Sequence, residues 1–309
     1  MRVLVLAGGP DAEREVSISS GTAIAGALAA QGVSADLRLI DAPDSLADLV
    51  GDVIFPSLHG PWGEGGPLQD VLERDGRPYV GCGPRAARLC MDKLAAKLVA
   101  AHVGVSTGEA ALLNRNDSAS PIEPPAVVKP VFEGSSVGLH LCHDEAALAD
   151  AVSAAHGSDR LMMVERLIRG REITCGLIDS GDGLRALPVI EIVPAGETYD
   201  YEAKYDRDDT QYLVGGDAAP LADHGAVQQD SLCVASALGV RHLARVDYIV
   251  DDSGRHHFLE INTMPGFTTH SLLPKAAAAS GTPMGELCKR LCELAAARHS
   301  SPAGDPVES

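Results

Sequence analysis

The chain has 309 residues, of which 45% are hydrophobic and 22% charged, and its formal net charge is −18. This composition is typical of a folded globular protein with more than one core, and no apolar run approaches the roughly 18 residues of a membrane span. The acidic balance argues against nucleic acid as a partner, because phosphate backbones bind basic surfaces.

The seven cysteines are scattered, with no CxxC motif, and an odd number of them is typical of a reducing compartment. Cys288 and Cys292 lie four residues apart on a predicted helix, which favours core packing over metal binding. The N-terminus, MRVLVLAGG, predicts a buried strand and not a signal peptide. We therefore expect a cytoplasmic protein without a membrane partner.

The first lobe is predicted to alternate strands and helices. Strands are expected at 2–7, 35–40, 53–58 and 79–81, and helices at 16–30, 45–49 and 68–73. Such alternation is typical of a parallel sheet, whose ligands bind beyond the carboxyl ends of the strands. Gly8-Gly9 and His59-Gly60 both fall there. We expect this lobe to end near residue 88.

Two segments of this lobe carry candidate ligand groups. Glu13 follows the GGP turn at the start of a helix, where it either complements the helix dipole or binds a substrate ammonium; the residues alone leave both open. The loop 59–66 holds the only Trp and four glycines, so its backbone can approach a ligand closely.

The second lobe is predicted to contain a phosphate site. A helix is expected at 91–103, followed by a short strand at 126–130 that carries Lys129 and by the glycine- and serine-rich loop 133–138. Backbone N–H groups and hydroxyls in such a loop can cradle phosphate, although the segment is not a P-loop. A helix at 144–155 and strands at 161–165 and 172–178 follow, with a hinge between these strands.

The third lobe is predicted to supply a lid and a metal site. The Tyr-rich segment 198–211 is a candidate lid, helices are expected at 229–238, 273–279 and 284–297, and the tail 300–309 is predicted to be disordered. Between them, 245–267 predicts a β-hairpin around Ser253-Gly254.

The hairpin register follows from its apolar residues. Pairing Val246 with Ile261 and Tyr248 with Leu259 makes one apolar face, so that the opposite face pairs Arg245 with Asn262 and Asp247 with Glu260. Two opposed carboxylates repel, which predicts a cation between them. Asp247, Glu260 and Asn262 suit Mg²⁺, which usually brings substrate phosphates. A solvated hairpin with ordinary surface acids remains the alternative at this stage.

Together these residues indicate one chemistry. The four cations Lys93, Lys129, Lys204 and Arg245 and the ligand oxygens of Asp247, Glu260 and Asn262 can enclose a triphosphate. The sequence resembles the D-alanine–D-alanine ligases of the ATP-grasp superfamily over residues 2 to about 298. The resemblance rests on eight motifs in order: GGPDAEREVS (8–17), HGPWGEGGPLQDVLE (59–73), MDKLAAK (91–97), VVKPVFEGSSVG (127–138), VERLIRGREIT (164–174), YDYEAKY (199–205), ARVD (244–247) and LEINTMPGFTTHSL (259–272).

The resemblance implies a three-lobed α/β ATP-grasp fold, in which a parallel-sheet N-terminal lobe (1–88) precedes a central lobe (89–168) and a C-terminal lobe (169–299) that together clamp ATP. It implies a reaction that joins two D-alanines through an acyl phosphate, in a homodimer that uses ATP and two Mg²⁺ ions, with Mn²⁺ able to substitute. ATP-binding groups would be Lys93, Lys129, Ser135, Ser136, Glu165, Arg166, Ile168, Glu172 and Lys204. The metal ligands would be Asp247, Glu260 and Asn262.

The resemblance also implies the amino-acid site. Glu13 would bind the ammonium of the first D-alanine and meet Ser135 and Tyr205 across the closed lid. Arg245 and the Gly266 backbone would line the oxyanion region. The remaining substrate-binding residues would be His59, Ser271 and Leu272.

Three positions depart from the family pattern. Gly65 replaces a usual Asp, which removes a charge from the first-substrate loop and is expected to loosen it. Arg166 replaces a Lys beside the adenine, and residues 214–217 are expected to make the lid exit more flexible. Two alternatives therefore stay open: a ligase with D-lactate or D-serine as second substrate, and an inactive ATP-binding regulatory module. Tyr205 argues against the D-lactate form, because the resemblance associates that specificity with loss of the tyrosine hydroxyl.

Overall fold

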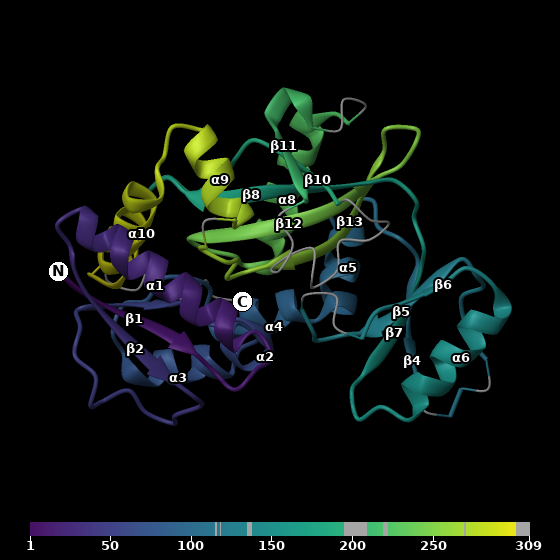
Figure 1. The fold of residues 1–309 in the computed structure, drawn as a ribbon, viewed down its shortest axis with the longest axis horizontal. Helices are drawn as coiled ribbons and strands as arrows, with labels where there is room; N and C mark the ends of the chain where they lie inside the picture. The colour runs from purple at the N-terminus through teal and green to yellow at the C-terminus, as the bar shows by residue number, and fades with distance from the viewer. Residues whose placement is uncertain are drawn as a thin grey trace, which may run out of the picture.

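The computed structural model describes residues 1–114, 116–117, 119–134, 138–194, 209–218, 222–268 and 270–300. Within these ranges the strands form three sheets, of three, four and six strands. The three-stranded sheet lies near the N-terminus and the four-stranded sheet lies at the opposite end of the molecule, with the six-stranded sheet between them (Figure 1).

The N-terminal sheet is parallel, as predicted. Its strands pair in the order β2-β1-β3, and they are β1 (Arg2–Gly8), β2 (Ser34–Ile40) and β3 (Val53–Pro56). Parallel neighbours need a crossover connection, and α1 (Arg14–Ala30) supplies the first one. The carboxyl ends of β1 and β3 lead into Gly9 and His59, so both predicted ligand segments lie at one edge of the sheet.

The helix predicted at 45–49 is wrong. One hydrogen bond, from Leu49 N to Leu46 O, closes a single turn there. The guanidinium of Arg77 donates to the carbonyls of Leu46, Leu49 and Gly51 at 3.1, 2.7 and 3.4 Å. These donors satisfy the backbone carbonyls of the segment without a helix.

The C-terminal helix closes back on the N-terminal lobe (Figure 1). Residues of α10 (Met284–Ser300) share one apolar cluster with α1 and β1. Cys288 and Cys292 are fully buried in that cluster, which confirms their predicted core packing. Helix α10 extends to Ser300, so the predicted disordered tail is wrong at this residue, and 301–309 lie outside the described residues.

The central sheet is antiparallel, in the order β4-β7-β5-β6. Its strands are β4 (Ala110–Leu113), β5 (Ala126–Pro130), β6 (His140–Cys142) and β7 (Met162–Arg166). Helix α6 (Glu145–His156) begins at Asp144, whose side chain accepts from Ala147 N at 2.9 Å. Its apolar face packs on Val128 and Val164, which buries one side of this small sheet.

The helix predicted from 91 to 103 is confirmed as α5 (Lys93–His102), which begins two residues later than expected. A further helix that was not predicted, α4 (Pro84–Met91), precedes it, and Asp92 separates the two. Its ψ of 99° ends α4, and its carboxylate accepts from Ala95 N at 3.0 Å to cap α5. Lys93 therefore occupies the first position of a new helix.

The six-stranded sheet is antiparallel, with β11-β10-β8-β12-β13 in order and β9 beside β8. The strands are β8 (Arg171–Asp179), β9 (Leu184–Ala186), β10 (Ile190–Val193), β11 (Gln211–Val214), β12 (Leu243–Val250) and β13 (His256–Asn262). Helices α8 (His224–Leu238) and α9 (Leu272–Ala279) pack against it.

The segment 214–217, which we expected to be flexible, has regular hydrogen bonds. Val214 ends β11 and Gly215–Asp217 form the 3-10 helix η1. Gly215 has a φ of +69°, which glycine adopts without strain, and its N–H donates to Val189 O at 2.8 Å.

The predicted hairpin is formed by β12 and β13, and three of its four predicted pairs are confirmed. Arg245 pairs with Asn262, Val246 with Ile261 and Asp247 with Glu260, and the register then shifts between Asp247 and Tyr248.

The fourth pair is wrong, because Tyr248 pairs with Phe258 instead of Leu259. The Tyr248 and Phe258 rings meet edge to face at 6.0 Å inside the core. This β-bulge leaves Leu259 to face a cavity on the other side of the sheet.

Candidate active site

A cavity of about 1170 Å³ lies between the central and C-terminal sheets. This volume slightly exceeds the ~300–1,000 Å³ of common ligand pockets and has room for a nucleotide. Eight of the predicted site residues line it together: Lys93, Lys129, Glu165, Arg166, Ile168, Glu172, Asp247 and Glu260. Lys93 and Glu260, which are 167 positions apart in sequence, therefore line the same cavity, as the nucleotide hypothesis requires.

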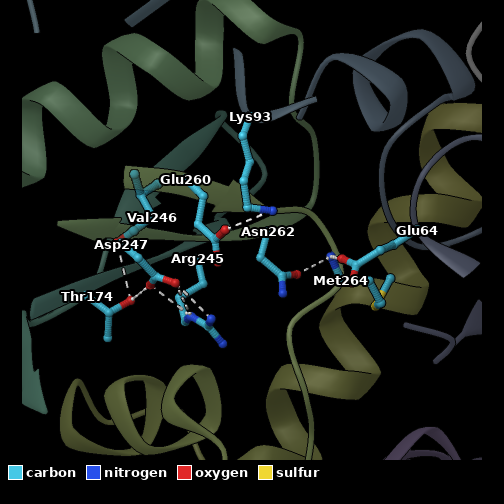
Figure 2. A network of polar contacts seen from close by, with 9 residues as sticks. All are labelled: Glu64, Lys93, Thr174, Arg245, Val246, Asp247, Glu260, Asn262 and Met264. Carbon is cyan, nitrogen blue, oxygen red and sulfur yellow. Dashed lines mark hydrogen bonds and ion pairs between the residues drawn. The ribbon is translucent and has the colours of Figure 1, made fainter. Parts of the chain in front are cut away.

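Lys93 joins three parts of the molecule at this wall. Its Nζ lies 3.2 Å from Glu260 Oε2 on β13, as Figure 2 shows, and 2.5 Å from the carbonyl oxygen of Glu133. Glu133 lies directly before Gly134, at the entrance of the predicted phosphate loop. A cation at this position would meet the phosphates of a bound nucleotide.

A second network surrounds Glu165, which is 4% exposed. Its Oε1 lies 2.5 Å from Lys129 Nζ and its Oε2 lies 2.9 Å from Lys97 Nζ. Burial alone would raise the pKa of Glu165, but the two ammonium groups outweigh it and lower this pKa to about 2.

The two lysines of this network differ. Burial lowers the pKa of Lys97, and its neighbour Lys129 adds to that effect. Burial also opposes the charge on Lys129, yet Glu165 and Glu260 raise its pKa overall. Lys129 is therefore a fixed cation in the cavity wall, held by anions on two sheets.

The polar face of the hairpin carries the predicted metal ligands (Figure 2). Asp247 is 5% exposed and accepts from Thr174 Oγ1 at 2.6 Å and from Arg245 Nη2 at 2.8 Å. The cation that we predicted between Asp247 and Glu260 is thus replaced by a separate cation on each carboxylate. Among the residues that the structure describes, no three His, Cys, Asp or Glu side chains gather as a metal cluster.

The donor set nevertheless fits Mg²⁺. Asp247 and Glu260 line the same cavity as the lysines. Asn262 lies two residues after Glu260 on β13, where its amide oxygen accepts from Met264 N at 3.0 Å and keeps a second lone pair. Mg²⁺ in phosphoryl-transfer sites usually takes one or two protein carboxylates and completes its shell with phosphate oxygens and water. Among the described residues, this site has two carboxylates and no third acid or histidine, which matches the usual coordination of Mg²⁺.

The N-terminal loop 59–66 is fixed to the end of the hairpin. His59 Nδ1 lies 3.0 Å from Met264 O. Met264 N donates to Glu64 Oε2 at 3.2 Å, and Figure 2 draws this second contact. Both side chains are buried. Burial lowers the pKa of His59, whereas burial and the nearby Glu13 raise the pKa of Glu64 to about 8.

Glu13 lies where the first lobe meets the phosphate loop. It is 9% exposed, and a Cβ placed on Gly134 would lie 3.1 Å from Glu13 Oε2. The carboxylate therefore points toward the central lobe instead of only complementing α1. This placement favours the substrate-binding alternative for Glu13.

The segment 264–272 forms a tight turn before α9. Ser271 Oγ accepts from Thr268 N at 2.9 Å and sits at the N-cap of α9. A Cβ on Gly266 would lie 2.8 Å from the same oxygen, so glycine is needed for this approach. Leu272 is the first residue of α9, and the backbone N–H groups of Leu272 and Leu273 in its first turn suit a carboxylate, whereas Pro274 supplies none.

The far end of the cavity is formed by the hinge between β7 and β8. Ile168, Ile249 and Leu259 give it apolar walls, and Glu172 adds a carboxylate. Arg166 lies at its edge, where Nη1 donates to Glu123 O at 3.2 Å. Such a slot with exposed backbone suits a purine ring.

Four predicted site residues, Ser135, Ser136, Lys204 and Tyr205, lie outside the described residues. Three polar residues of the site were not predicted from the sequence: the buried Lys97 and Thr174, and the partly buried acceptor Asp11. Only Lys97 had a sequence signal, since it lies four residues after Lys93 on one helix and so shares its face.

Gly65 has a packing reason. A Cβ there would lie 2.3 Å from the carbonyl oxygen of Pro61, so no side chain fits without a backbone shift. Asp11 Oδ2 accepts from Trp62 N at 2.8 Å and from Gly63 N at 3.3 Å. The loop that we expected to be looser is therefore closely packed.

Across the described ranges, no helix is both long and apolar enough to span a bilayer.

Comparisons with known proteins agree with this geometry. The family model for the C-terminus of D-ala D-ala ligases matches residues 103–293. The D-alanine–D-alanine ligase of Syntrophotalea carbinolica is 41% identical over 305 residues, covering 96% of this chain and 97% of the relative.

Solved structures agree as well. The D-alanine–D-alanine ligase of Bacillus anthracis, complexed with ATP, superposes with a TM-score of 0.81 at 32% identity, over 97% of this chain and 98% of that one. The VanG D-Ala:D-Ser ligase of Enterococcus faecalis gives 0.80 at 26% identity, over 95% and 99%. The predicted ATP-grasp fold is confirmed, and the chain belongs to the D-alanine–D-alanine ligase family.

Proposed function

We propose that this protein uses ATP to join two D-alanine molecules into D-alanyl-D-alanine for peptidoglycan precursors. The observation that carries the proposal is one cavity that combines Lys93 and Lys129 with Asp247 and Glu260. Phosphoryl transfer depends on cations and metal ligands around the transferring group. The 41% identity to a relative of that name over nearly the whole chain supports this assignment.

The reaction needs two steps, because a carboxylate is a poor electrophile. An oxygen of the first D-alanine attacks the γ-phosphorus of ATP, the bond to the β–γ bridging oxygen breaks, and ADP leaves. The amine of the second D-alanine then attacks the acyl carbon of the D-alanyl phosphate, loses a proton, and phosphate leaves. Arg245 and the Gly266 N–H would stabilise the oxyanion of this second step.

The nucleotide would occupy the cavity along its length. Lys93 and Lys129 would bind the phosphates, together with Ser135, Ser136 and Lys204, which the family resemblance assigns to ATP. Glu165 and Arg166 at the end of β7 and Ile168 in the hinge would meet the adenine, and Glu172 would bind the ribose. The apolar walls at this end of the cavity support that orientation.

The amino acids would bind between the first lobe and the hairpin. Glu13 would hold the ammonium of the first D-alanine, with His59 beside it, and Ser271 and Leu272 would receive the carboxylate of the second. The N-terminus of α9 supports the carboxylate position. Closure of a lid that includes Tyr205 would exclude water, which would otherwise hydrolyse the acyl phosphate.

Asp247, Glu260 and Asn262 would hold two Mg²⁺ ions, and Mn²⁺ would substitute. When bound, these ions would offset the negative charge of the phosphates. Arg245 and Thr174 would keep the Asp247 carboxylate oriented toward the cavity, as their hydrogen bonds to it suggest.

We further propose the lobe boundaries 1–88, 89–168 and 169–299, a homodimer and a cytoplasmic location. Two-fold dimers are the commonest oligomers, and the family resemblance implies one here. Sedimentation analysis of the purified protein would test the dimer directly.

The test of the function is phosphate release from ATP and Mg²⁺ with a panel of amino acids, followed by identification of the product. D-alanine-dependent release with D-alanyl-D-alanine as product is the expected result. A mixed product with D-serine or D-lactate would favour the alternative ligase. ATP binding without release across the panel would favour a regulatory module.

Glu260→Gln tests the assigned metal site. It should lower kcat by at least about 100-fold with little change in stability, because it removes charge from a partly exposed ligand and leaves the core intact. The exposed Glu293→Gln on α10 is the matched control and should keep wild-type activity. Parallel losses of stability and rate in Glu260→Gln would indicate a structural role.

A further inference from the structure

Lys97 is a buried lysine whose role none of the family motifs explains. It is 3% exposed and lies one helical turn after Lys93 on α5, facing the same cavity. A lysine this deeply buried is rare unless it is paired, because removing an ammonium from water is costly. Because Lys97 is buried beside Lys93 and Lys129 at the same cavity, we expect it to have a specific function.

The ammonium of Lys97 has three partners on three different segments. Nζ lies 2.9 Å from Glu165 Oε2 on β7, 2.9 Å from Thr107 Oγ1 and 3.3 Å from Phe258 O on β13. The ammonium donates hydrogen bonds to Thr107 and Phe258 and forms an ion pair with Glu165. Lys97 thus links α5 to both sheets that enclose the cavity.

The contact between Lys97 and Glu165 affects the position of Lys129. Glu165 Oε1 contacts Lys129 and Oε2 contacts Lys97, so one carboxylate bridges two ammonium groups. Without Lys97, Oε2 would lose its ion-pair partner within the described residues, and the carboxylate could rotate toward Lys129 alone. Lys129 would then be drawn out of the cavity wall and partly neutralised.

The contact between Lys97 and Phe258 O affects the position of the hairpin strand β13. Thr107 Oγ1 also donates to Phe258 O at 2.8 Å, and Phe258 N donates to Ser106 O at 2.7 Å. Phe258 directly precedes the bulged Leu259 and Glu260. Lys97 therefore reaches the same stretch of β13 that carries the predicted metal ligand.

We propose that Lys97 is a positioning residue of the nucleotide site, which fixes Lys129 toward the phosphates through Glu165 and fixes the bulged end of β13 through Phe258. The proposal rests on the proposed function for its kinetic consequences. Its structural part, that Lys97 acts on nucleotide binding through Glu165, stands on the contacts alone.

Binding of the non-hydrolysable β,γ-methylene analogue of ATP, measured by calorimetry, provides the first test. Lys97→Met should weaken binding by about tenfold or more, while Lys97→Arg, which keeps a cation near Glu165, should lose less than about threefold. The exposed Lys289→Met on α10 is the matched control for loss of one lysine and should bind as wild type. Unchanged binding by Lys97→Met would overturn the proposal.

A double-mutant cycle with Glu165→Gln tests whether Lys97 acts on nucleotide binding through Glu165. If Lys97 acts through Glu165, the double variant should bind the analogue no more weakly than the weaker single variant, because each change breaks the same chain of contacts. Additive losses would overturn the route through Glu165. If Lys97→Met does not fold, Thr107→Val and Lys97→Arg provide a milder perturbation of the same ammonium.

Steady-state kinetics separates positioning from a general structural role. Lys97→Met should raise the KM for ATP by about tenfold and leave the KM for the first D-alanine within about twofold. Equal increases in both KM values, together with a lower melting temperature, would indicate general loosening and refute the proposal. If the wild type releases no phosphate with D-alanine, the proposed function fails, but the analogue-binding cycle still tests Lys97.

Discussion

Glu64 gives the sharpest prediction, because a buried acid makes stability depend on pH in an unusual direction. It is 6% exposed, and its two oxygens accept from Gly60 N at 3.3 Å and Met264 N at 3.2 Å. Burial, reinforced by Glu13, raises its pKa from 4.5 to about 8. The folded carboxyl therefore keeps a proton that the unfolded chain releases.

The sign and size of the pH dependence of the free energy of unfolding follow from proton linkage. Between the two pKa values the folded state binds more protons than the unfolded state, so the free energy of unfolding falls as pH rises. Each pH unit in this window is worth about 1.36 kcal/mol. From about pH 5 to about pH 8, Glu64 should remove roughly 4 kcal/mol of stability.

Urea unfolding across this pH range measures the effect. Glu64→Gln carries no titrating proton, so the free energy of unfolding of the wild type should fall relative to that of the variant by roughly 4 kcal/mol from about pH 5 to about pH 8. Glu286→Gln makes the same chemical change at the exposed start of α10 and controls for loss of one carboxyl. Parallel curves for wild type and Glu64→Gln would show that Glu64 is ionised in the folded protein and would refute the reasoning.

Three further predictions concern the first lobe and the surface. Gly65→Ala should cost about 1–3 kcal/mol of stability, because its Cβ would overlap Pro61 O; an unchanged melting temperature would contradict the packing argument. Asp11→Ala should raise the KM for the first D-alanine, since the N–H groups of Trp62 and Gly63 lose their acceptor, whereas Asp11→Asn should largely restore it; equal defects would assign the effect to charge. With a net charge of −18, the melting temperature should rise between about 0.05 and 0.5 M NaCl, and a constant value would exclude net repulsion as a destabilising force.

The hairpin shows what the sequence could and could not predict. Val246 and Ile261 fixed the register near the site, because a one-residue slip would have buried Asp247 and Glu260 in the core. Beyond Asp247 that constraint vanishes, since Tyr248 can face either Leu259 or Phe258 without exposing an apolar side chain. Only the three-dimensional fit of the rings in the core selects Phe258.

Tertiary contacts explain most of the other differences. The segment 45–49 has helix-forming residues, but Arg77, nearly 30 positions away, takes the carbonyls that a helix would use. The short strands β4, β9, β10 and β11 have three or four residues each, which is too few for periodicity to distinguish them from loops. Partners distant in sequence decide both cases.

The distribution of lysine connects these observations. The chain has only six lysines among 25 basic residues, yet Lys93, Lys97 and Lys129 are all buried around one cavity. An ammonium is a compact charge with three donors that can each take a different acceptor, whereas the planar guanidinium of arginine suits paired carboxylate oxygens. The ammonium of Lys97 reaches acceptors on three different segments. Half of the lysines of this chain therefore lie at one cavity, whereas arginines form most of the surface ion pairs among the described residues.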